Sequence, residues 1–499
     1  MSGPQSLVLI TVDCLRADHV GFLGYDRPTT PFLDSLARES VAFSNAIVAG
    51  APTYYSFPAI LASRHPLALG RDVLGLAPDE PTIATGLRQS GYATAAFLAG
   101  NPYLSRRFGY DSGFDTFRDF LDAEMGAPVQ NGNGNGTRRT RLNRSLAEAC
   151  HKIGPIGVLY DELYFQYCQR LASPAPSLDG LRRYPAANVI VDGACAWLAG
   201  VEEPFFLWLH LMDPHSPYYP PGEALRLMGR GDLTASRARY LNSYWNRGDL
   251  GANRFKRHRE EVIALYDAGI RWVDTQVAGL VDKLRNSHLW ENCVFALTAD
   301  HGEEFLDHEG RYHPPSRVTE ELVRVPLLLR VPGLKQAAPV EAPFSLVHLA
   351  PTLLEAAGAS VPSGFCGHSY WSQLRSAADW DETGIVECIT DCADLFRVEG
   401  RLGKRVVAVR ERRYKLVFDF GSCREQLFDL ESDPGELHPL LGDTEKPVRG
   451  RLLRRLRQHL TDSRGHGASE RRLRALLREV RLESAQAAEH ENDRVRMAG

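Results

Sequence analysis

The chain has 499 residues, with 58 lysines and arginines against 62 aspartates and glutamates, so its formal net charge is −4. Apolar residues make up 44% of the sequence and charged residues 24%, which is ordinary for a globular protein and excludes collagen-like, disordered and supercharged classes. The near-neutral charge argues against a protein that binds nucleic acid over its whole surface, and we expect no nucleic-acid partner.

The first apolar run, residues 7–12, is preceded by neither a basic region nor a small-residue cleavage site, so we predict no signal peptide. The sequence contains no uninterrupted run of about 18 apolar residues, and we therefore expect no transmembrane segment. The nine cysteines include no CxxC pair, which fits reduced thiols better than a disulfide framework. Together these features predict a cytoplasmic protein.

Short apolar runs alternate with longer amphipathic segments, a pattern typical of βαβ units around a mostly parallel sheet. Strands are predicted at residues 7–12, 93–98, 205–211, 294–298 and 325–331. Their nearly continuous apolarity indicates burial on both faces. Helices are predicted at residues 30–39, 82–89, 187–199 and 258–286. The fold class is therefore α/β.

Two regions depart from this pattern. Residues 125–145 are rich in Gly, Asn and Arg, and we expect a mobile insertion that either recruits an anionic substrate or is simply solvated. From about residue 376 the β patterns become shorter, which indicates a small antiparallel appendage. We divide the chain into a main domain (1–375), a small C-terminal α+β subdomain (376–445) and a basic helical tail (446–499).

The tail combines many arginines with leucines at helical spacing. Two amphipathic basic helices are predicted there, the second around residues 473–480. Such helices could dock on a partner, on an acidic membrane surface or on the body of the protein.

Polar side chains follow three predicted strands: Asp13, then the group His210, Asp213 and His215, then the pair Asp300 and His301. In an open α/β sheet, ligands bind beyond the C-terminal ends of the strands. Two carboxylates and an imidazole at neighbouring strand ends can bind one divalent cation, and this mixture favours Mn, Zn or Mg over a pure calcium cage. A single aspartate at a strand end is more often a helix N-cap than a ligand, and spacing does not show whether these residues converge.

Motifs around these residues occur in a fixed order along the chain. They are Val12-Asp-Cys-Leu-Arg-Ala-Asp-His19, Gly21-Phe-Leu-Gly-Tyr25, Thr30-Pro-Phe-Leu-Asp34, Gly113-Phe-Asp-Thr-Phe117, Met212-Asp-Pro-His-Ser-Pro-Tyr218, Thr298-Ala-Asp-His-Gly-Glu303, Arg324-Val-Pro-Leu327, Arg413-Tyr-Lys-Leu416 and Leu427-Phe-Asp-Leu-Glu-Ser-Asp-Pro-Gly-Glu436. In this order they resemble the sulfatase family of the alkaline phosphatase superfamily, over about residues 5–440. The resemblance implies a large mixed, mostly parallel sheet flanked by helices, and a metal-dependent enzyme that acts on sulfate or phosphate esters.

By this resemblance, the nucleophile lies at the head of a helix, where helix-terminal amides and the metal stabilise the attacking oxygen. True sulfatases carry a Cys or Ser there, in a motif with Pro two residues later and a following Arg, and oxidise it to formylglycine. The matching segment places Ser56 at the nucleophile and Pro58 two residues on, but Ile60 replaces the Arg. We therefore expect Ser56 to remain an unmodified serine. Thr53 is the rival nucleophile, because related phosphotransferases use Thr.

This departure bears on the substrate. A hydrated formylglycine releases sulfate by collapsing to the aldehyde, whereas a serine sulfate must be attacked at sulfur. Phosphoserine, by contrast, is an accepted intermediate of metal-assisted displacement. Asn101 replaces the sulfate-binding Lys of classical sulfatases, which resembles the phosphonate and phosphodiester hydrolases. We therefore predict a phosphatase or phosphodiesterase activity in preference to sulfate ester cleavage.

The resemblance also assigns metal ligands. Asp13, Asp300, His301 and Ser56 would hold one or two divalent ions, which could be Mn, Zn, Mg or Ca. Cys14 stands where a second Asp ligand is usual, and we expect it to pack rather than to bind.

Two histidines are candidates for the general acid that protonates the leaving group, His215 by the family resemblance and His313 by its place in the sequence. His215 would hydrogen-bond the transferred group or protonate the leaving oxygen, with a purely structural role as the alternative. His313 lies on a segment that could fold back over the site. With Asn101, Ser56 and the rival Thr53, they complete the expected catalytic set.

Several functions stay open. In the leading hypothesis Ser56 attacks the ester of a small molecule, glycan or lipid, and water then releases the group. A phospho- or sulfotransferase would share the first half of this reaction and pass the group to a hydroxyl acceptor. An inactive metal-binding scaffold, recruited through its basic tail, is the third reading. We expect the wall that faces the substrate to come from residues 118–185 and 219–257.

Overall fold

The computed structural model describes residues 4–70, 73–121, 154–171, 177–334, 339–380, 383–390, 397, 403–440, 442 and 445–465. The predicted insertion at 125–145 and the second predicted tail helix lie outside these residues. Among the helices that are described, none combines the length and the apolar character needed to cross a membrane.

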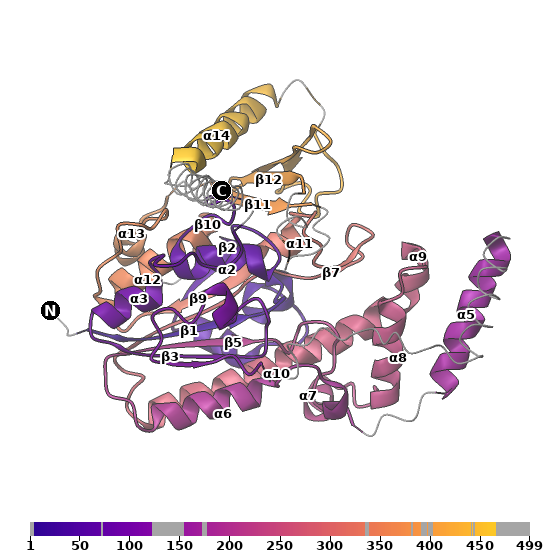
Figure 1. Cartoon of the computed structure of the whole chain (residues 1–499), viewed down its shortest axis with the longest axis horizontal. Helices are drawn as coiled ribbons and strands as arrows, with labels where there is room; N and C mark the ends of the chain where they lie inside the picture. Colours follow the sequence, from indigo (N-terminus) through magenta and orange to yellow (C-terminus); the bar gives the residue numbers. More distant parts are fainter. Residues whose placement is uncertain are drawn as a thin grey trace, which may run out of the picture.

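A mixed sheet of eight strands forms the centre of the molecule (Figure 1). Its strands are β1 (Ser6–Val12), β2 (Val41–Ile47), β3 (Ala93–Leu98), β4 (Thr116–Arg118), β5 (Phe205–Leu211), β6 (Cys293–Ala299), β9 (Arg324–Arg330) and β10 (Phe344–Ser345). The order is β10-β2-β9-β6-β1-β5-β3-β4, and β9 alone runs antiparallel to its neighbours β2 and β6 within this sheet. The predicted mixed, mostly parallel sheet is confirmed.

All five predicted strands occur, and three further strands complete the sheet. β2 escaped prediction because Ser44 and Asn45 interrupt its apolar run. The structure explains the interruption, since the pairing of β2 with β9 shifts register between Phe43 and Ala46. The two polar residues lie at this irregularity, where strict alternation of side chains is lost.

Helices cover both faces of the sheet. The described α-helices are α1 (Pro31–Ala37), α2 (Thr53–Ala62), α3 (Ile83–Gln89), α5 (Gly154–Leu171), α6 (Ala187–Leu198), α7 (Gly222–Leu227), α8 (Ala235–Trp245), α9 (Ala252–Phe255), α10 (Arg259–Asn286), α11 (Glu320–Val323), α12 (Leu349–Ala357), α13 (Trp371–Ser376) and α14 (Lys446–Gly465). Short 3₁₀ helices lie at η1 (Ala17–His19), η2 (Gly21–Leu23), η3 (Arg106–Phe108), η4 (Asp179–Leu181), η5 (Lys256–His258) and η6 (Leu346–His348). Helices α1, α6 and α10 pack together on one face, and α2, α3 and α12 pack on the other (Figure 1).

The predicted helix boundaries hold to within a few residues. Thr82, expected as the first residue of its helix, is the N-cap of α3, and its hydroxyl accepts a hydrogen bond from the Thr85 N–H at 3.0 Å. The long predicted amphipathic helix is α10, whose buried side carries apolar residues at helical spacing along its 28 residues.

A second, antiparallel sheet forms the C-terminal appendage that the sequence predicts. Its strands are β11 (Gly384–Ile389), β12 (Arg405–Arg410), β13 (Tyr414–Asp419) and β14 (Arg424–Asp429), in chain order. One face continues the main hydrophobic core through Val386, Cys388, Val406 and Ala408. The other face packs against Leu452 and Leu456 of α14. The first predicted tail helix is therefore docked on the body of the protein.

This docking gives a stability prediction. Leu456 is 3% exposed in the small core between α14 and the second sheet. Leu456→Ala should lower the free energy of unfolding by about 2–5 kcal/mol, because it removes buried methyl groups and leaves a cavity. Urea unfolding measures the change. Arg455→Ala, at an exposed position of the same helix, should leave the free energy nearly unchanged; an equal loss in both variants would contradict the docking.

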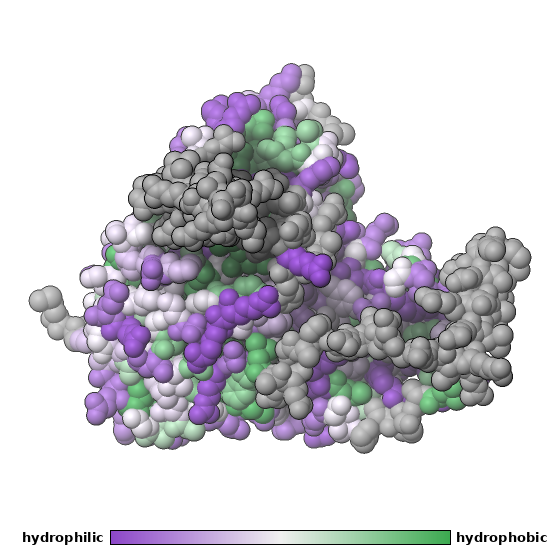
Figure 2. Space-filling view, viewed as in Figure 1, coloured by the Kyte–Doolittle hydropathy of each residue, from purple (hydrophilic) through white to green (hydrophobic). Residues whose placement is uncertain are grey.

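The described surface is mainly polar. Figure 2 shows hydrophilic residues over much of the visible face, with apolar areas scattered between them. The most exposed large apolar side chains include Leu163, Tyr167 and Leu171 of α5.

Candidate active site

The parallel strands β1, β5 and β6 bring the predicted polar residues to one edge of the sheet. Val12 of β1 lies opposite Ala299 of β6, so Asp13 and Asp300, the next residues, are neighbours. On the other side of β1, Thr11 lies opposite His210 of β5. These polar residues therefore converge at one edge of the sheet, which their spacing in the sequence could not show.

Asp13, Asp300 and His301 form a fully buried cluster. The His301 Nε2 atom lies 3.7 Å from Asp13 Oδ1 and 3.6 Å from Asp300 Oδ2. His210 joins the cluster, with its Nε2 atom 3.3 Å from Asp13 Oδ2. One oxygen or nitrogen from each of Asp13, His210 and Asp300 lies within 4.8 Å of the other two.

The donor set fits a divalent cation. The Asp300 Oδ2 atom is buried and has no hydrogen-bond partner within the described residues, which is costly for a carboxylate oxygen without a cation. Burial, and then the nearby Asp13, raise the pKa of Asp300. Burial opposes ionisation of Asp13 as well, but the charge of His215 and the hydrogen bond from His210 hold the pKa of Asp13 well below its ordinary value. Two buried carboxylates with an imidazole suit Mn, Zn or Mg.

Thr53 contacts this cluster. It is the first residue of α2, where the helix dipole is positive, and its hydroxyl oxygen lies 3.3 Å from His301 Nε2. A hydrogen bond from the same hydroxyl lowers the pKa of Asp300, but burial raises this pKa by more. Thr53 thus has the position expected of a nucleophile at the head of a helix.

Ser56 is placed differently. It lies three residues into α2, is fully buried, and its hydroxyl has no hydrogen-bond partner in the part of the chain that the structure describes. The Ser56–Pro58 spacing matches the sulfatase motif, but the helix begins three residues earlier, at Thr53. The contacts therefore bring the hydroxyl of Thr53, the rival, to the cluster, and no contact of this kind is found for the Ser56 hydroxyl among the described residues.

Asn101 acts on the cluster through Asp13. Its Nδ2 atom donates to Asp13 Oδ2 at 3.0 Å, and its Oδ1 atom accepts from the Tyr103 N–H at 3.0 Å. Both ends of the amide are engaged, so Asn101 orients an expected metal ligand.

His313 and His215 lie together beside the cluster. The His313 ring centroid is 4.6 Å from that of His301 and 5.1 Å from that of His215. The His313 Nδ1 atom lies 2.6 Å from Glu303 Oε2, which fixes the ring. The segment that carries His313 folds back over the site, as the sequence analysis expected.

Cys14 is expected to pack rather than to bind a metal, and the structure places its thiol within the site. Its Sγ atom lies 3.1 Å from Asp13 Oδ1 and 3.4 Å from His313 Nδ1. A left-handed backbone conformation, with φ of 60°, turns the residue after β1 toward the cluster. Burial, and then the charge of Glu303, raise the pKa of this thiol. Sequence shows the residue but not this backbone conformation.

Asp213, the other aspartate at a strand end, is not a ligand. Its carboxylate accepts from Arg182 Nη1 at 3.0 Å and from the Ala187 N–H, the first of α6, at 2.9 Å. Burial raises the pKa of Asp213 to about 6. It accepts the Ala187 N–H from outside α6, whose own N-cap is Ala186, so it is not the helix N-cap that the sequence analysis kept as the alternative.

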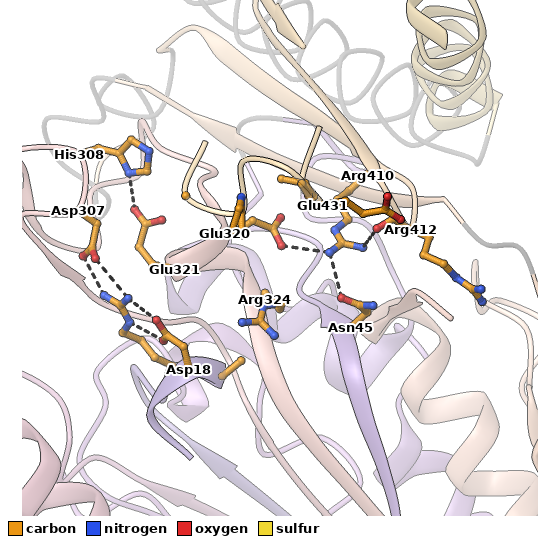
Figure 3. Close-up of a pocket in the computed structure, with 15 residues that line it drawn as sticks. Asp18, Asn45, Asp307, His308, Glu320, Glu321, Arg324, Arg410, Arg412 and Glu431 are labelled. Carbon is orange, nitrogen blue, oxygen red and sulfur yellow. Dashed lines mark hydrogen bonds and ion pairs between the residues drawn. The ribbon is translucent and has the colours of Figure 1, made fainter. Parts of the chain in front are cut away.

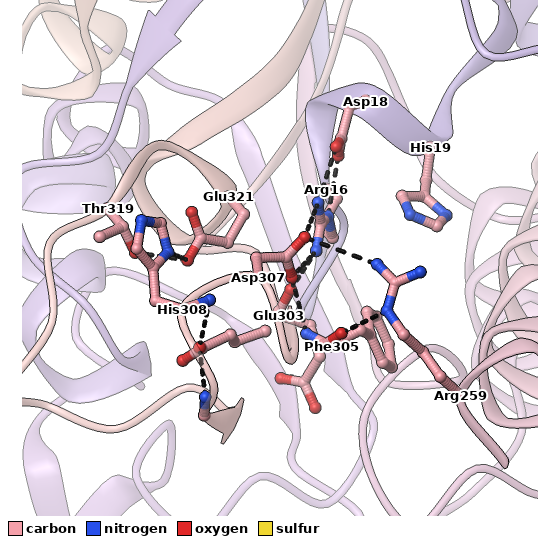
Figure 4. A network of polar contacts seen from close by, with 12 residues as sticks. Arg16, Asp18, His19, Arg259, Glu303, Phe305, Asp307, His308, Thr319 and Glu321 are labelled. Atoms are coloured by element: carbon pink, nitrogen blue, oxygen red, sulfur yellow. Dashed lines mark hydrogen bonds and ion pairs between the residues drawn. The ribbon is translucent and has the colours of Figure 1, made fainter. Parts of the chain in front are cut away.

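A polar network supports the segment between His301 of the cluster and His313 (Figure 4). Arg16 pairs with Asp307 at 2.9 Å and with Asp18 at 2.7 Å. His308 lies 3.0 Å from Glu321, and this hydrogen bond raises the pKa of His308 from its ordinary value of 6.5 to about 9.

The His308–Glu321 pair predicts a pH dependence. Because the pKa of His308 is raised in the folded state, its contribution to stability is complete below pH 6.5 and is lost as the pH rises through about 9. The free energy of unfolding should therefore differ most between the wild type and His308→Gln at pH 6, and least at pH 9.5. Urea unfolding at both pH values measures the two differences. A difference that grows with pH would contradict this assignment.

Several cavities lie near the network and the cluster, and two of them bear on the site. The first, of 540 Å³, lies between β1 and the second sheet, and its charged side chains largely pair with one another, as in Arg410–Glu320 at 3.2 Å (Figure 3). None of the residues of the Asp13, Asp300 and His301 cluster lines this cavity. The second, of 420 Å³, is lined by His313 and Ser216 and so opens directly beside the site.

Residues 5–359 match the family model described as Sulfatase, and residues 309–465 match N-sulphoglucosamine sulphohydrolase, C-terminal. The chain belongs to the sulfatase family. Enzymes of the sulfatase family generally bind a divalent metal ion, which agrees with the buried cluster.

Similar proteins include other sulfatase-family members. Arylsulfatase K from Canis lupus familiaris is 29% identical over 184 residues, which are 36% of this chain and 34% of that protein. The chain spans about a third to a half of the length of the Arylsulfatase K relatives it matches.

Two solved structures share the fold. BT4656, in complex with its substrate D-glucosamine-2-N,6-O-disulfate, aligns with a TM-score of 0.68 and 16% identity over 93% of this chain and 98% of that one. The phosphonate monoester hydrolase SpPMH from Silicibacter pomeroyi aligns with a TM-score of 0.65 and 23% identity over 92% and 96%.

Proposed function

We propose that this sulfatase-family protein is a metal-dependent hydrolase in which the Thr53 hydroxyl attacks a phosphate or sulfate ester, with phosphate mono- or diesters preferred. One observation carries the proposal: Thr53 begins α2 and its hydroxyl lies 3.3 Å from His301, beside a buried carboxylate oxygen of Asp300 that has no hydrogen-bond partner among the described residues.

The chain supplies each part of the reaction. A divalent ion held by Asp13, Asp300 and His301 would supply positive charge that lowers the pKa of a hydroxyl and stabilises the transferred group. The Thr53 oxygen forms a bond to phosphorus or sulfur while the bond to the leaving oxygen breaks. His215 or His313 gives that oxygen its proton. Water then attacks the group on Thr53, releases it and restores the hydroxyl.

The preference for phosphate rests on the nucleophile. A threonine offers no route to formylglycine, so a sulfate on Thr53 would have to leave by attack at sulfur, whereas a phosphothreonine is hydrolysed by the same in-line displacement that formed it. Asn101, which orients Asp13, stands where classical sulfatases have a lysine for sulfate. Sulfate ester hydrolysis is the second candidate, and the Sulfatase family model with the Arylsulfatase K relatives supports it.

A small-molecule or glycan ester is the proposed substrate. The disulfated glucosamine bound by BT4656 supports a sugar ester. Docking of a partner through α14 is not part of the proposal, because Leu452 and Leu456 of this helix are buried against the protein's own second sheet.

Four aryl substrates test the function. Metal-free protein is supplied with Mn, Zn, Mg or Ca and assayed with p-nitrophenyl phosphate, bis-p-nitrophenyl phosphate, p-nitrophenyl phenylphosphonate and p-nitrophenyl sulfate. We expect metal-dependent release of p-nitrophenol, fastest from the phosphate mono- or diester. Dominant sulfate turnover would overturn the preference for phosphate. Failure to cleave any of the four esters with any of the metals would overturn the hydrolase and favour a transferase or a scaffold.

A further inference from the structure

Apart from His313, the residues that line the 420 Å³ cavity beside the site have no part in the proposed reaction. His313 forms one wall, and Arg183, Tyr219, Ser243, Asn246 and Tyr312 lie around it. Its volume falls within the range of about 300–1,000 Å³ that is usual for small-molecule sites. Most of these residues come from the two ranges, 118–185 and 219–257, that the sequence analysis expected to face the substrate.

The cavity is positively charged. Its lining residues include no aspartate or glutamate. Arg183 is exposed and makes no hydrogen bond or ion pair with any residue that the structure describes, whereas its neighbour Arg182 is paired with Asp213 at 3.0 Å. The Arg183 charge reaches Tyr219, where it opposes the rise in pKa that burial causes. An arginine without a carboxylate partner in a cavity is suited to bind a planar or tetrahedral anion.

The other lining groups suit a hydroxylated ring. Ser243 and Asn246 on and just after α8 offer polar groups, and Tyr219 and Tyr312 combine flat apolar surfaces with hydroxyls. The wall is held in place by Asn242, whose Oδ1 accepts from the Tyr218 N–H at 2.7 Å and whose Nδ2 donates to the Tyr218 carbonyl at 3.0 Å. A fixed wall with a few polar groups fixes the orientation of a ligand.

We propose that this cavity binds the alcohol part of the ester as a hydroxyl-rich ring that carries a second anionic group, a sulfate or a carboxylate, which Arg183 binds. The inference rests on the proposed function for the position of the reacting ester beside His313. It adds a substrate class and a residue that determines specificity.

A binding measurement tests the cavity without catalysis. Glucosamine N-sulfate, glucuronate and glucose are titrated by NMR into the full-length protein and into Arg183→Ala, Arg183→Lys and, as a matched control at an exposed arginine of α7, Arg226→Ala. We expect the wild type and Arg226→Ala to bind at least one charged sugar about 10-fold more tightly than glucose, in line with a charged hydrogen bond. Arg183→Ala should lose this preference and Arg183→Lys should keep part of it. The sugar that shows the preference identifies the anion as sulfate or carboxylate. Equal binding of all three sugars, or a preference that survives in Arg183→Ala, would overturn the inference.

Kinetics separate the inference from the proposed function. For a hexose ester with a second anionic group, Arg183→Ala should raise KM about 10-fold, and it should raise the KM of the p-nitrophenyl ester by less, because that ester has no second anion. An equal effect on both esters would count against Arg183 as a specificity residue. If the wild type cleaves no ester but binds the charged sugar through Arg183, the proposed hydrolase function is wrong and the proposed sugar site is supported. If the wild type cleaves aryl esters but does not prefer a charged sugar to glucose, the hydrolase function is supported and the sugar site is wrong.

Discussion

Thr53→Ala should lower kcat by at least about 1,000-fold, the scale of loss seen when a nucleophile is removed. The threonine hydroxyl is the one that reaches the cluster, at 3.3 Å from His301. Ser56→Ala should leave kcat within about threefold, because it removes a buried hydroxyl that has no partner among the described residues and whose loss leaves no other group unpaired. Initial rates with the best p-nitrophenyl ester measure both.

Thr53→Ser is the matched control for this pair. It keeps a hydroxyl at the head of α2 and should retain part of the activity that Thr53→Ala loses. Circular dichroism of each variant excludes unfolding as the cause. The reverse pattern, an active Thr53→Ala and an inactive Ser56→Ala, would return the nucleophile to Ser56.

The second large effect concerns the metal. Asp300→Asn should weaken binding of the activating ion by at least about 100-fold and abolish activity at low metal concentration, because the variant removes a buried negative charge from the cluster. Calorimetric titration of metal-free protein measures the affinity.

Asp213→Asn is the matched control for the metal. Asp213 also follows a strand end, but it pairs with Arg182 and the head of α6. Its variant should lose stability while the metal affinity stays within about twofold of the wild type. Unchanged metal affinity in Asp300→Asn would contradict the assignment of the cluster.

The sequence predicts the sheet well because its strands are buried on both faces. The runs that became β1, β3 and β5 are almost continuously apolar, and burial on both faces favours this composition. The same strands carry Asp13 and His210 to one edge. The antiparallel direction of β9 is not visible in its sequence, since an apolar run reads alike in both directions.

The convergence of the two carboxylates and the imidazole was predictable from the sequence, and the hydroxyl that contacts them was less so. Asp13, Asp300 and His301 follow strands, so the sheet places them. The choice between Thr53 and Ser56 depends on where α2 begins, and a motif with an altered Arg position does not determine that. The role of Cys14 depends on a left-handed backbone conformation, which the sequence around a non-glycine residue does not announce.

The central claim is that the group passes through Thr53, and an acid quench during turnover tests it most directly. Trypsin should release residues 39–64 as one peptide that contains both Thr53 and Ser56, and fragmentation in a mass spectrometer locates a bound phosphoryl or sulfuryl group between them. The account predicts the group on Thr53. A group on Ser56, or a Thr53→Ala protein that still forms the modified peptide, would contradict it.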